Sequence, residues 1–209
     1  GDLLWSNPAN WSANVVPGPN DDVRIDVGAS DPQIRFTSEA GFRQVRSPEL
    51  RESLSVTGGQ LTVTNGARCW ASVALAGGTL APTPLLNQAA GTVNLSGANA
   101  MGPVVNAGRF WVQSGTTTLS GPYTQSAGMT RLGSPGTPAT LALPLGSSAT
   151  FNGGTLGGAG TLVGNLLMNG GTLAPGFSPG AFSVDGDLTM GPSSTMAMAP
   201  KPCTANRNT

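Results

Sequence analysis

The segment GTLGGAGTLVGNLLMNGGTLAPGFSPGAFSVDGDLTM, from Gly154 to Met190, carries the fold prediction for this chain. Within this segment the phrase Gly-Thr-Leu starts at Gly154, Gly160 and Gly171, and the first charged residue is Asp185. Glycine and proline separate apolar runs of a few residues, which is typical of short strands joined by tight turns. A short neutral phrase that recurs in this way indicates the turn-and-strand unit of a stacked β-solenoid, in which each unit covers the apolar face of its neighbours.

The region before this segment alternates apolar and polar residues with a period of two, which is the signature of strands. In Gln60–Gly66, Leu61 and Val63 are expected on one side and the threonines between and after them on the other. In Arg109–Gly115 the same alternation places Trp111 on the outward, polar side. No stretch has helical spacing with caps at both ends, so the chain is expected to be all-β.

Two all-β architectures use short alternating strands, a β-solenoid and a β-sandwich. The solenoid is favoured because glycine recurs at the entry to strands, where equivalent corners of successive coils would stack. The sequence Gly-x-[Leu/Val/Phe] begins at Gly59, Gly78, Gly91, Gly108, Gly154, Gly160 and Gly171. Because the intervals vary, the coils are expected either to differ in length or to contain several short strands.

Charge is distributed very unevenly along the 209 residues. Residues 1–52 hold eight of the ten acidic residues, and none occurs from Ser53 to Val184. This change predicts three regions: an N-terminal cap with the first strands at 1–55, β-solenoid repeats at 56–199, and a polar tail at 200–209. In the cap, Trp5 and Trp11 are expected to cover the open first coil, because the ends of solenoids need caps.

The low charge limits the partners that the chain can have. Only 10% of its residues are charged and its formal net charge is zero, so no strong field would attract nucleic acid. No run reaches the ~18 apolar residues of a membrane span, so no membrane insertion of this segment is expected. The only two cysteines are Cys69 and Cys203, and the sequence leaves open whether they pair.

Three stretches together resemble one family of proteins. The run from Gly153 to Met190 resembles the β-strand repeat of autotransporter passenger domains and related bacterial surface proteins, through its Gly-Gly-Thr-Leu phrases and the Ala-Pro-Gly-x-Ser-Pro-Gly turn. Gly121–Leu132 (GPYTQSAGMTRL) looks like the Tyr-x-Gln strand of that family. Trp5–Ile25 is similar to the tryptophan-rich segment that often starts such passengers. These stretches cover about a third of the chain.

The resemblance implies a right-handed parallel β-helix with an N-terminal capping segment, secreted or displayed on the bacterial cell surface. It implies no single activity, because the family includes adhesins and toxins. The expected function is that of a non-catalytic structural or adhesive passenger; the alternative is a carbohydrate-binding or polysaccharide-processing β-helix relative. Its partners would be surface molecules or glycans of a host or neighbouring cell. Whether the chain is a fragment of a longer autotransporter, and its oligomeric state, are left open.

The residues available for catalysis are few. Glycoside hydrolysis normally needs two carboxyl groups, but the repeats supply none between Ser53 and Val184, and the chain contains no histidine to act as a general base. We therefore predict that the chain is not an enzyme and uses no cofactor.

The candidates for binding are three aromatic residues that lie close together in the sequence, Phe110, Trp111 and Tyr123. Aromatic rings of this kind can anchor a partner or a sugar ring. No metal site is predicted. The acidic group with the most carboxylates for a metal ion consists of Asp21, Asp22 and Asp26. A turn followed by a strand with its polar side in water explains these residues equally well, so they are only weak candidates for metal ligands.

Overall fold

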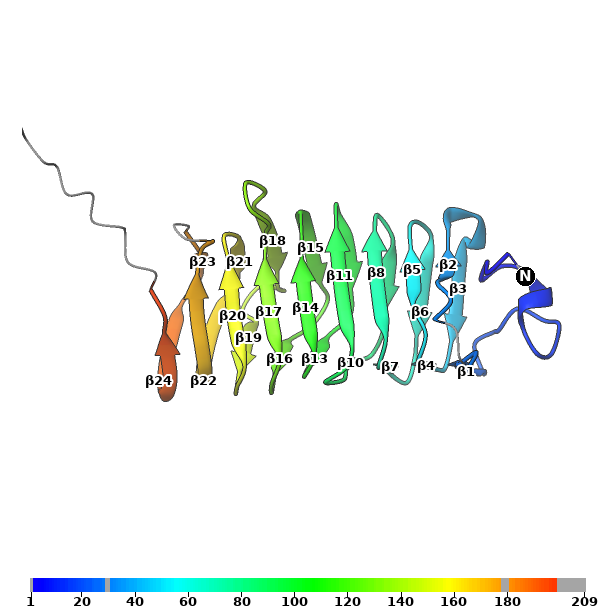
Figure 1. Cartoon of the computed structure of the whole chain (residues 1–209), viewed down its shortest axis with the longest axis horizontal. Coiled ribbons are helices and arrows are strands. Elements are labelled where there is room, and N and C mark those ends of the chain that lie inside the picture. Colours follow the sequence, from blue (N-terminus) through cyan, green and yellow to red (C-terminus); the bar gives the residue numbers. More distant parts are fainter. Residues whose placement is uncertain (1, 29–30, 178–180, 199–209) are drawn as a thin grey trace, which may run out of the picture.

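The chain folds into a β-solenoid of about eight turns. The computed structural model describes residues 2–28, 31–177 and 181–198. In Figure 1 the coils follow one another along the long axis of the molecule. Every pairing between named strands is parallel. The solenoid prediction is therefore confirmed, because a sandwich is built from antiparallel strands.

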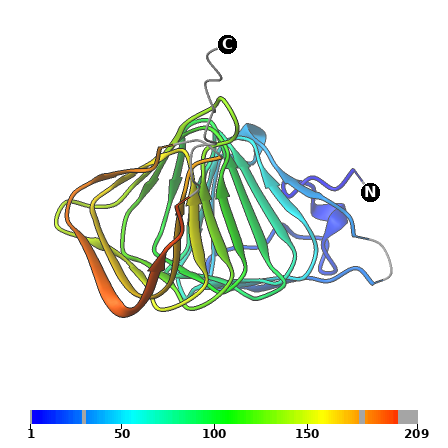
Figure 2. The same cartoon turned by 60° about the vertical axis from the view of Figure 1, so that its left-hand side comes forward.

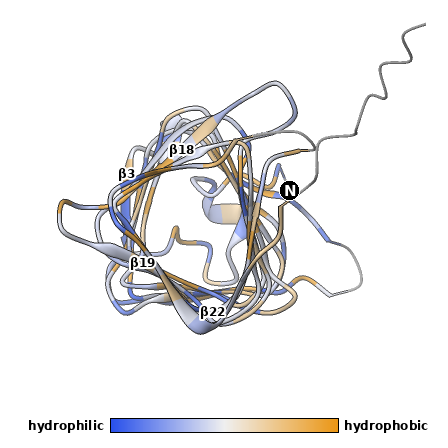
Figure 3. Cartoon of the chain, turned by 90° about the vertical axis from the view of Figure 1, so that its left-hand side faces the viewer, coloured by the Kyte–Doolittle hydropathy of each residue, from blue (hydrophilic) through white to orange (hydrophobic). Residues whose placement is uncertain are grey.

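Each coil contributes one strand to each of three faces, and these faces surround a single core (Figure 3). The first face consists of β1 (Asp22–Ile25), β4 (Ser47–Leu50), β7 (Ala67–Cys69), β10 (Leu85–Asn87), β13 (Val104–Asn106), β16 (Tyr123–Gln125), β19 (Ser148–Phe151) and the start of β22 (Asn165–Pro175). The second face consists of β2 (Ile34–Phe36), β5 (Leu54–Val56), β8 (Ser72–Ala76), β11 (Thr92–Ser96), β14 (Arg109–Val112), β17 (Met129–Leu132), β20 (Thr155–Gly158) and the end of β22. The third face consists of β3 (Phe42–Val45), β6 (Gln60–Val63), β9 (Thr79–Ala81), β12 (Asn99–Met101), β15 (Gly115–Leu119), β18 (Ala139–Ala142), β21 (Thr161–Val163) and β23 (Ser183–Asp185).

The last strands close the stack at its C-terminal end. β22 turns the corner between the first two faces without a break, so the strands of these faces belong to one sheet. β24 (Leu188–Met196) follows β22 around the same corner and completes this 16-stranded sheet. Leu188 and Met190 of β24 are 42% and 36% exposed, because no described strand pairs with β24 on its other side.

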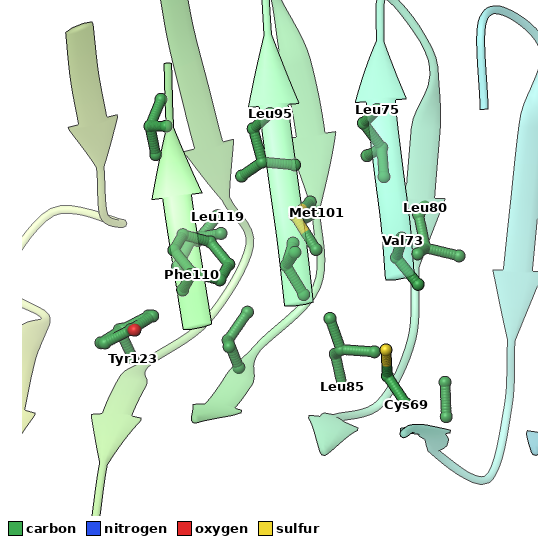
Figure 4. Close-up of a cluster of buried hydrophobic side chains, with 14 of the residues drawn as sticks. Cys69, Val73, Leu75, Leu80, Leu85, Leu95, Met101, Phe110, Leu119 and Tyr123 are labelled. Carbon is green, nitrogen blue, oxygen red and sulfur yellow. The ribbon is translucent and has the colours of Figure 1, made fainter. Parts of the chain in front are cut away.

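The core is built by the period-two alternation that the sequence predicts. Leu61 and Val63 of β6 are buried, as are Phe110 and Val112 of β14. Figure 4 shows how side chains from neighbouring coils meet inside the stack. Burying a side chain of this size contributes about 1.5–3 kcal/mol, so the solenoid depends mainly on contacts between successive coils.

Glycines stack at the corner where the chain enters the second face. Gly91, Gly108, Gly128, Gly154 and Gly171 each precede a strand of that face. A Cβ atom on Gly154 would lie 2.3 Å from the carbonyl oxygen of Gly128, and one on Gly171 would lie 2.4 Å from that of Gly154. The recurrence of glycine at strand entries is therefore required by the close stacking of equivalent corners.

The N-terminal segment caps the first coil, as expected from its tryptophans. It is at one end of the stack in Figure 2. The backbone N–H of Trp5 donates to the carbonyl oxygen of Arg35 in β2. The Trp5 ring is fully buried and packs edge-on against Trp11 and Phe36, with ring centroids 4.9 and 5.7 Å away. Two short 3-10 helices, η1 (Pro8–Asn10) and η2 (Ser38–Ala40), complete this end of the molecule.

The change in charge near residue 55 does not coincide with a break in the strands. β1 and β2 pair directly with β4 and β5, and β5 itself spans residues 54–56. The first coils thus belong to the same stack as the neutral repeats, and the charged residues change its surface rather than its architecture. The predicted polar tail, 200–209, lies outside the described residues.

Candidate functional site

The structure corrects the predicted aromatic binding group. Phe110 and Tyr123 are fully buried, and their rings pack against each other in the core with centroids 5.2 Å apart. Neither ring can contact a ligand on the surface. Only Trp111, which the alternation places on the outward side of β14, is partly exposed.

Tyr123 belongs to a buried polar network instead. Its hydroxyl group is hydrogen bonded to Thr130, whose hydroxyl donates to the side-chain oxygen of Gln125. Burial raises the pKa of Tyr123 well above its ordinary value. The phenol therefore stays protonated, and the side chain packs in the core.

The same network continues as a column of amides along the first face. Asn87 donates from Nδ2 to Oδ1 of Asn106 at 2.7 Å, and Asn106 donates from Nδ2 to Oε1 of Gln125 at 3.0 Å. All three side chains are buried. They occupy equivalent positions, 19 residues apart in the chain. Each amide ends one of the triplets Leu-Leu-Asn, Val-Val-Asn and Tyr-Thr-Gln, and the regular spacing of these triplets is a pattern from which the column could have been predicted. The role of these amides is structural.

On the outward side of the second face, arginines and aromatic rings form a patch that consists of Arg109, Trp111, Arg131 and Phe177. The guanidinium carbon of Arg109 lies 4.9 Å from the centroid of the Trp111 ring. That of Arg131 lies over two rings, 5.5 Å from the centroid of Trp111 and 4.1 Å from that of Phe177. The indole Nε1–H donates to the carbonyl oxygen of Gly133 at 2.9 Å, which fixes the orientation of the ring. We call these four residues the Arg–Trp patch.

The register of the sheet creates this patch. β14 and β17 pair so that Trp111 lies directly opposite Arg131. Arg109 is two residues before Trp111 on the same strand and therefore on the same side of the sheet. Cation–π contacts of this kind contribute about 0.5–1 kcal/mol each at exposed sites, and they hold the guanidinium groups over the rings.

Neither arginine of the patch forms an ion pair within the described residues. The ion pairs found there join Arg24 with Asp26, Arg46 with Asp22, and Arg51 with Glu49. All of these residues lie in the first two coils. Since the sequence has no acidic residue from Ser53 to Val184, Arg109 and Arg131 are positive charges in a stretch whose only other charged residue is Arg68.

A shallow depression adjoins Arg131 on this face. Gly157 of β20 lies opposite Arg131, and Ala174 of β22 lies opposite Gly157. Because these outward residues are so small, they leave the depression, which Thr155 and Gly176 also line. The guanidinium group thus borders a hollow whose floor is close to the backbone of the sheet.

The structure does not bring the weak metal candidates together as a site. The carboxylate of Asp22 is paired with Arg46, which lowers the pKa of that carboxyl group, and Asp26 is paired with Arg24. Asp21 accepts a hydrogen bond from a backbone N–H in its own turn at 2.8 Å. Among the described residues, no group of three or more His, Cys, Asp or Glu is placed to hold a metal ion.

Cys69 is buried at the start of the polar column, in the position equivalent to Asn87 of the next coil. Its thiol group donates to the carbonyl oxygen of Ala71 at 3.3 Å, and burial raises its pKa to about 12. A thiol that stays protonated is a poor nucleophile. The other cysteine, Cys203, lies outside the described residues.

Comparisons with protein-family models, with curated proteins and with solved structures found no match to this chain. In the part of the chain that the structure describes, none of the helices has the length and apolar character needed to cross a membrane. The arrangement of residues can donate hydrogen bonds and positive charge to an anion at the Arg–Trp patch.

Proposed function

We propose that this chain is a non-catalytic β-solenoid that acts as an adhesive or structural passenger, secreted from or displayed on a bacterial cell. The resemblance of Gly153–Met190 to autotransporter passenger repeats supports this location and role. One observation carries the proposal: the long, regular surface of the solenoid has no acidic residue from Ser53 to Val184.

The outward side of the third face illustrates such a surface. Thr116, Thr140 and Thr161 are in register on β15, β18 and β21, and the next outward positions of these strands hold Thr118, Ala142 and Val163. Hydroxyl groups in this arrangement remain solvated and contribute no base to activate a nucleophile. This favours binding or display over catalysis.

The alternative, a carbohydrate-binding relative, is favoured by one specific observation. Trp111 lies on the outside of the second face with its indole ring held by a hydrogen bond to Gly133. A fixed, partly exposed tryptophan beside arginines is a common feature of binding surfaces. This second function is compatible with the first, since an adhesive passenger needs a ligand.

The proposed location can be tested on intact cells of the organism that makes the protein. An epitope tag is inserted in the exposed loop at Leu145, which connects β18 and β19. External protease should remove the tag from intact cells, or the tagged chain should be found in the medium. A tag that is cut only after the cells are lysed would contradict secretion and surface display.

The proposed role can be tested with the purified full chain on beads. Beads that carry the chain should be retained on surfaces coated with host-cell or bacterial glycans more strongly than beads that carry the urea-unfolded chain. Equal retention of both kinds of bead on every surface would contradict an adhesive role.

A further inference from the structure

We infer that the Arg–Trp patch is a binding site for a polysaccharide that carries carboxylate groups, such as a chain of hexuronate units. This inference rests on the proposed function, because it names the ligand class of an adhesive surface. Its basis is the pair of guanidinium groups, Arg109 and Arg131, that are held over aromatic rings and have no acidic partner among the described residues.

The stacking determines how the arginines can bind. The guanidinium carbon of Arg131 lies over both the Trp111 ring and the Phe177 ring, and a guanidinium group held over a ring can still present N–H groups at its edge to a ligand. A guanidinium edge matches a carboxylate with two parallel hydrogen bonds. Because aromatic contacts restrict these side chains in advance, binding costs less conformational entropy than it would for a free surface arginine.

The spacing of the arginines suits a ligand with several carboxylates. Arg109 and Arg131 lie on adjacent strands, two positions apart in register. With strands about 4.8 Å apart and a rise of about 3.3 Å per residue, their Cα atoms are separated by about 8 Å. A polymer with repeated carboxylates can reach both guanidinium groups at once, and repeated contacts raise the overall affinity.

The surroundings favour a sugar over an acidic peptide. The depression beside Arg131 has Gly157 and Ala174 along its floor and the hydroxyl group of Thr155 at its side. A sugar ring can approach the sheet there and exchange hydrogen bonds with hydroxyl groups. An extended peptide usually adds to a free sheet edge, but β14 and β17 are paired on both sides.

The test uses the full chain in affinity electrophoresis through gels that contain polygalacturonate, neutral dextran or polyglutamate. Polygalacturonate should retard the protein, whereas dextran and polyglutamate should retard it much less. The variants Arg109→Gln and Arg131→Gln should each weaken binding to polygalacturonate about three- to tenfold. Both positions face outward, and unchanged circular dichroism and melting would show that the variants are folded.

The matched control is Arg68→Gln, which removes the same charge from an exposed position on the first face. Its binding should stay within about twofold of the wild type, since it leaves the patch intact. The inference is overturned if Arg109→Gln and Arg131→Gln bind like the wild type, if Arg68→Gln loses as much affinity as they do, or if polyglutamate binds as tightly as polygalacturonate.

The same samples separate this inference from the proposed function. The chain length of the polygalacturonate is measured after incubation with the protein. Absence of binding with an intact polymer would overturn the ligand assignment and leave the non-catalytic proposal in place. Binding with shortening of the polymer would support the site and overturn the non-catalytic proposal.

Discussion

Gly128 stacks so closely on Gly108 that a Cβ atom on Gly128 would lie 2.0 Å from the carbonyl oxygen of Gly108. That same oxygen accepts the backbone N–H of Met129 at 2.8 Å. The corner can therefore neither accommodate a side chain nor move apart without breaking the ladder between β14 and β17. This relationship explains why a glycine recurs at each entry to the second face from β11 onward.

Replacing Gly128 by alanine should destabilise the solenoid more than the same change at Gly97. Both glycines have φ of +74°, but the space around Gly97 is open. Gly97→Ala should cost about 1–2 kcal/mol from left-handed backbone strain alone. Gly128→Ala should add about 1–3 kcal/mol from overpacking. Urea denaturation of the two variants measures the difference, and equal midpoints would show that stacking at this corner is not tight.

The buried amide column predicts a second stability difference. Asn106→Ala removes one of the two hydrogen bonds that the Asn87 amide nitrogen donates and one of the two that the Gln125 side-chain oxygen accepts, and the loss of two buried hydrogen bonds costs about 1–3 kcal/mol. Asn94→Ala, at an outward position of β11, should change stability by about 0.5 kcal/mol or less. Thermal melting of both variants checks this, and a neutral Asn106→Ala would mean that the column contributes little.

Acid should loosen the N-terminal cap. The side-chain amide of Asn10, the backbone N–H of Leu4 and the side-chain amide of Asn7 donate to Asp2, and these bonds hold the pKa of its carboxyl group below the ordinary 3.8. A lowered pKa in the folded state contributes stability above pH 3.8 that is lost as the pH falls through the folded value.

Tryptophan fluorescence during an acid titration can follow this change, because Trp5 and Trp11 are both in the cap. The wild type should show a transition below pH 3.8. The Asp2→Asn variant, which has no carboxylate to titrate there, should show a smaller one. Identical titration curves for the two proteins would show that the Asp2 carboxylate does not stabilise the cap.

The Cys69 thiol should be unreactive in the folded protein. Its pKa of about 12 leaves almost no thiolate at pH 8, and the residue is fully buried. In a Cys203→Ser variant, a thiol reagent should label the chain only after denaturation. Rapid labelling of the native variant would show that the stack opens near β7.

The fold could be predicted from the sequence because the sequence patterns that indicate it are local. The alternation in Gln60–Gly66 and the glycines before strands are set by neighbouring residues and by the geometry of one corner. The outward position of Trp111 followed in the same way. Alternation alone can also mislead: continued through Ala139–Leu145, it would place Leu145 inward with Leu141 and Leu143, but Leu145 lies in the loop after β18 and is fully exposed.

The candidate site could not be predicted because it depends on contacts between coils. Trp111 and Arg131 become neighbours only through the register of β14 with β17, and coil length varies along the chain. Ala67 and Leu85 are 18 residues apart, whereas Tyr123 and Ala149 are 26 apart. For the same reason the sequence did not show that Thr130 would satisfy the Tyr123 hydroxyl group and allow that ring to be buried.

We propose that this solenoid binds or displays without catalysing a reaction. The decisive experiment incubates the purified full chain with a panel of neutral and acidic polysaccharides and simple esters, with and without calcium. We expect no new reducing ends, no unsaturated ends and no released acid above the buffer rate, because Ser53–Val184 contains no Asp, Glu or His. Reproducible turnover of any one of these substrates would contradict it.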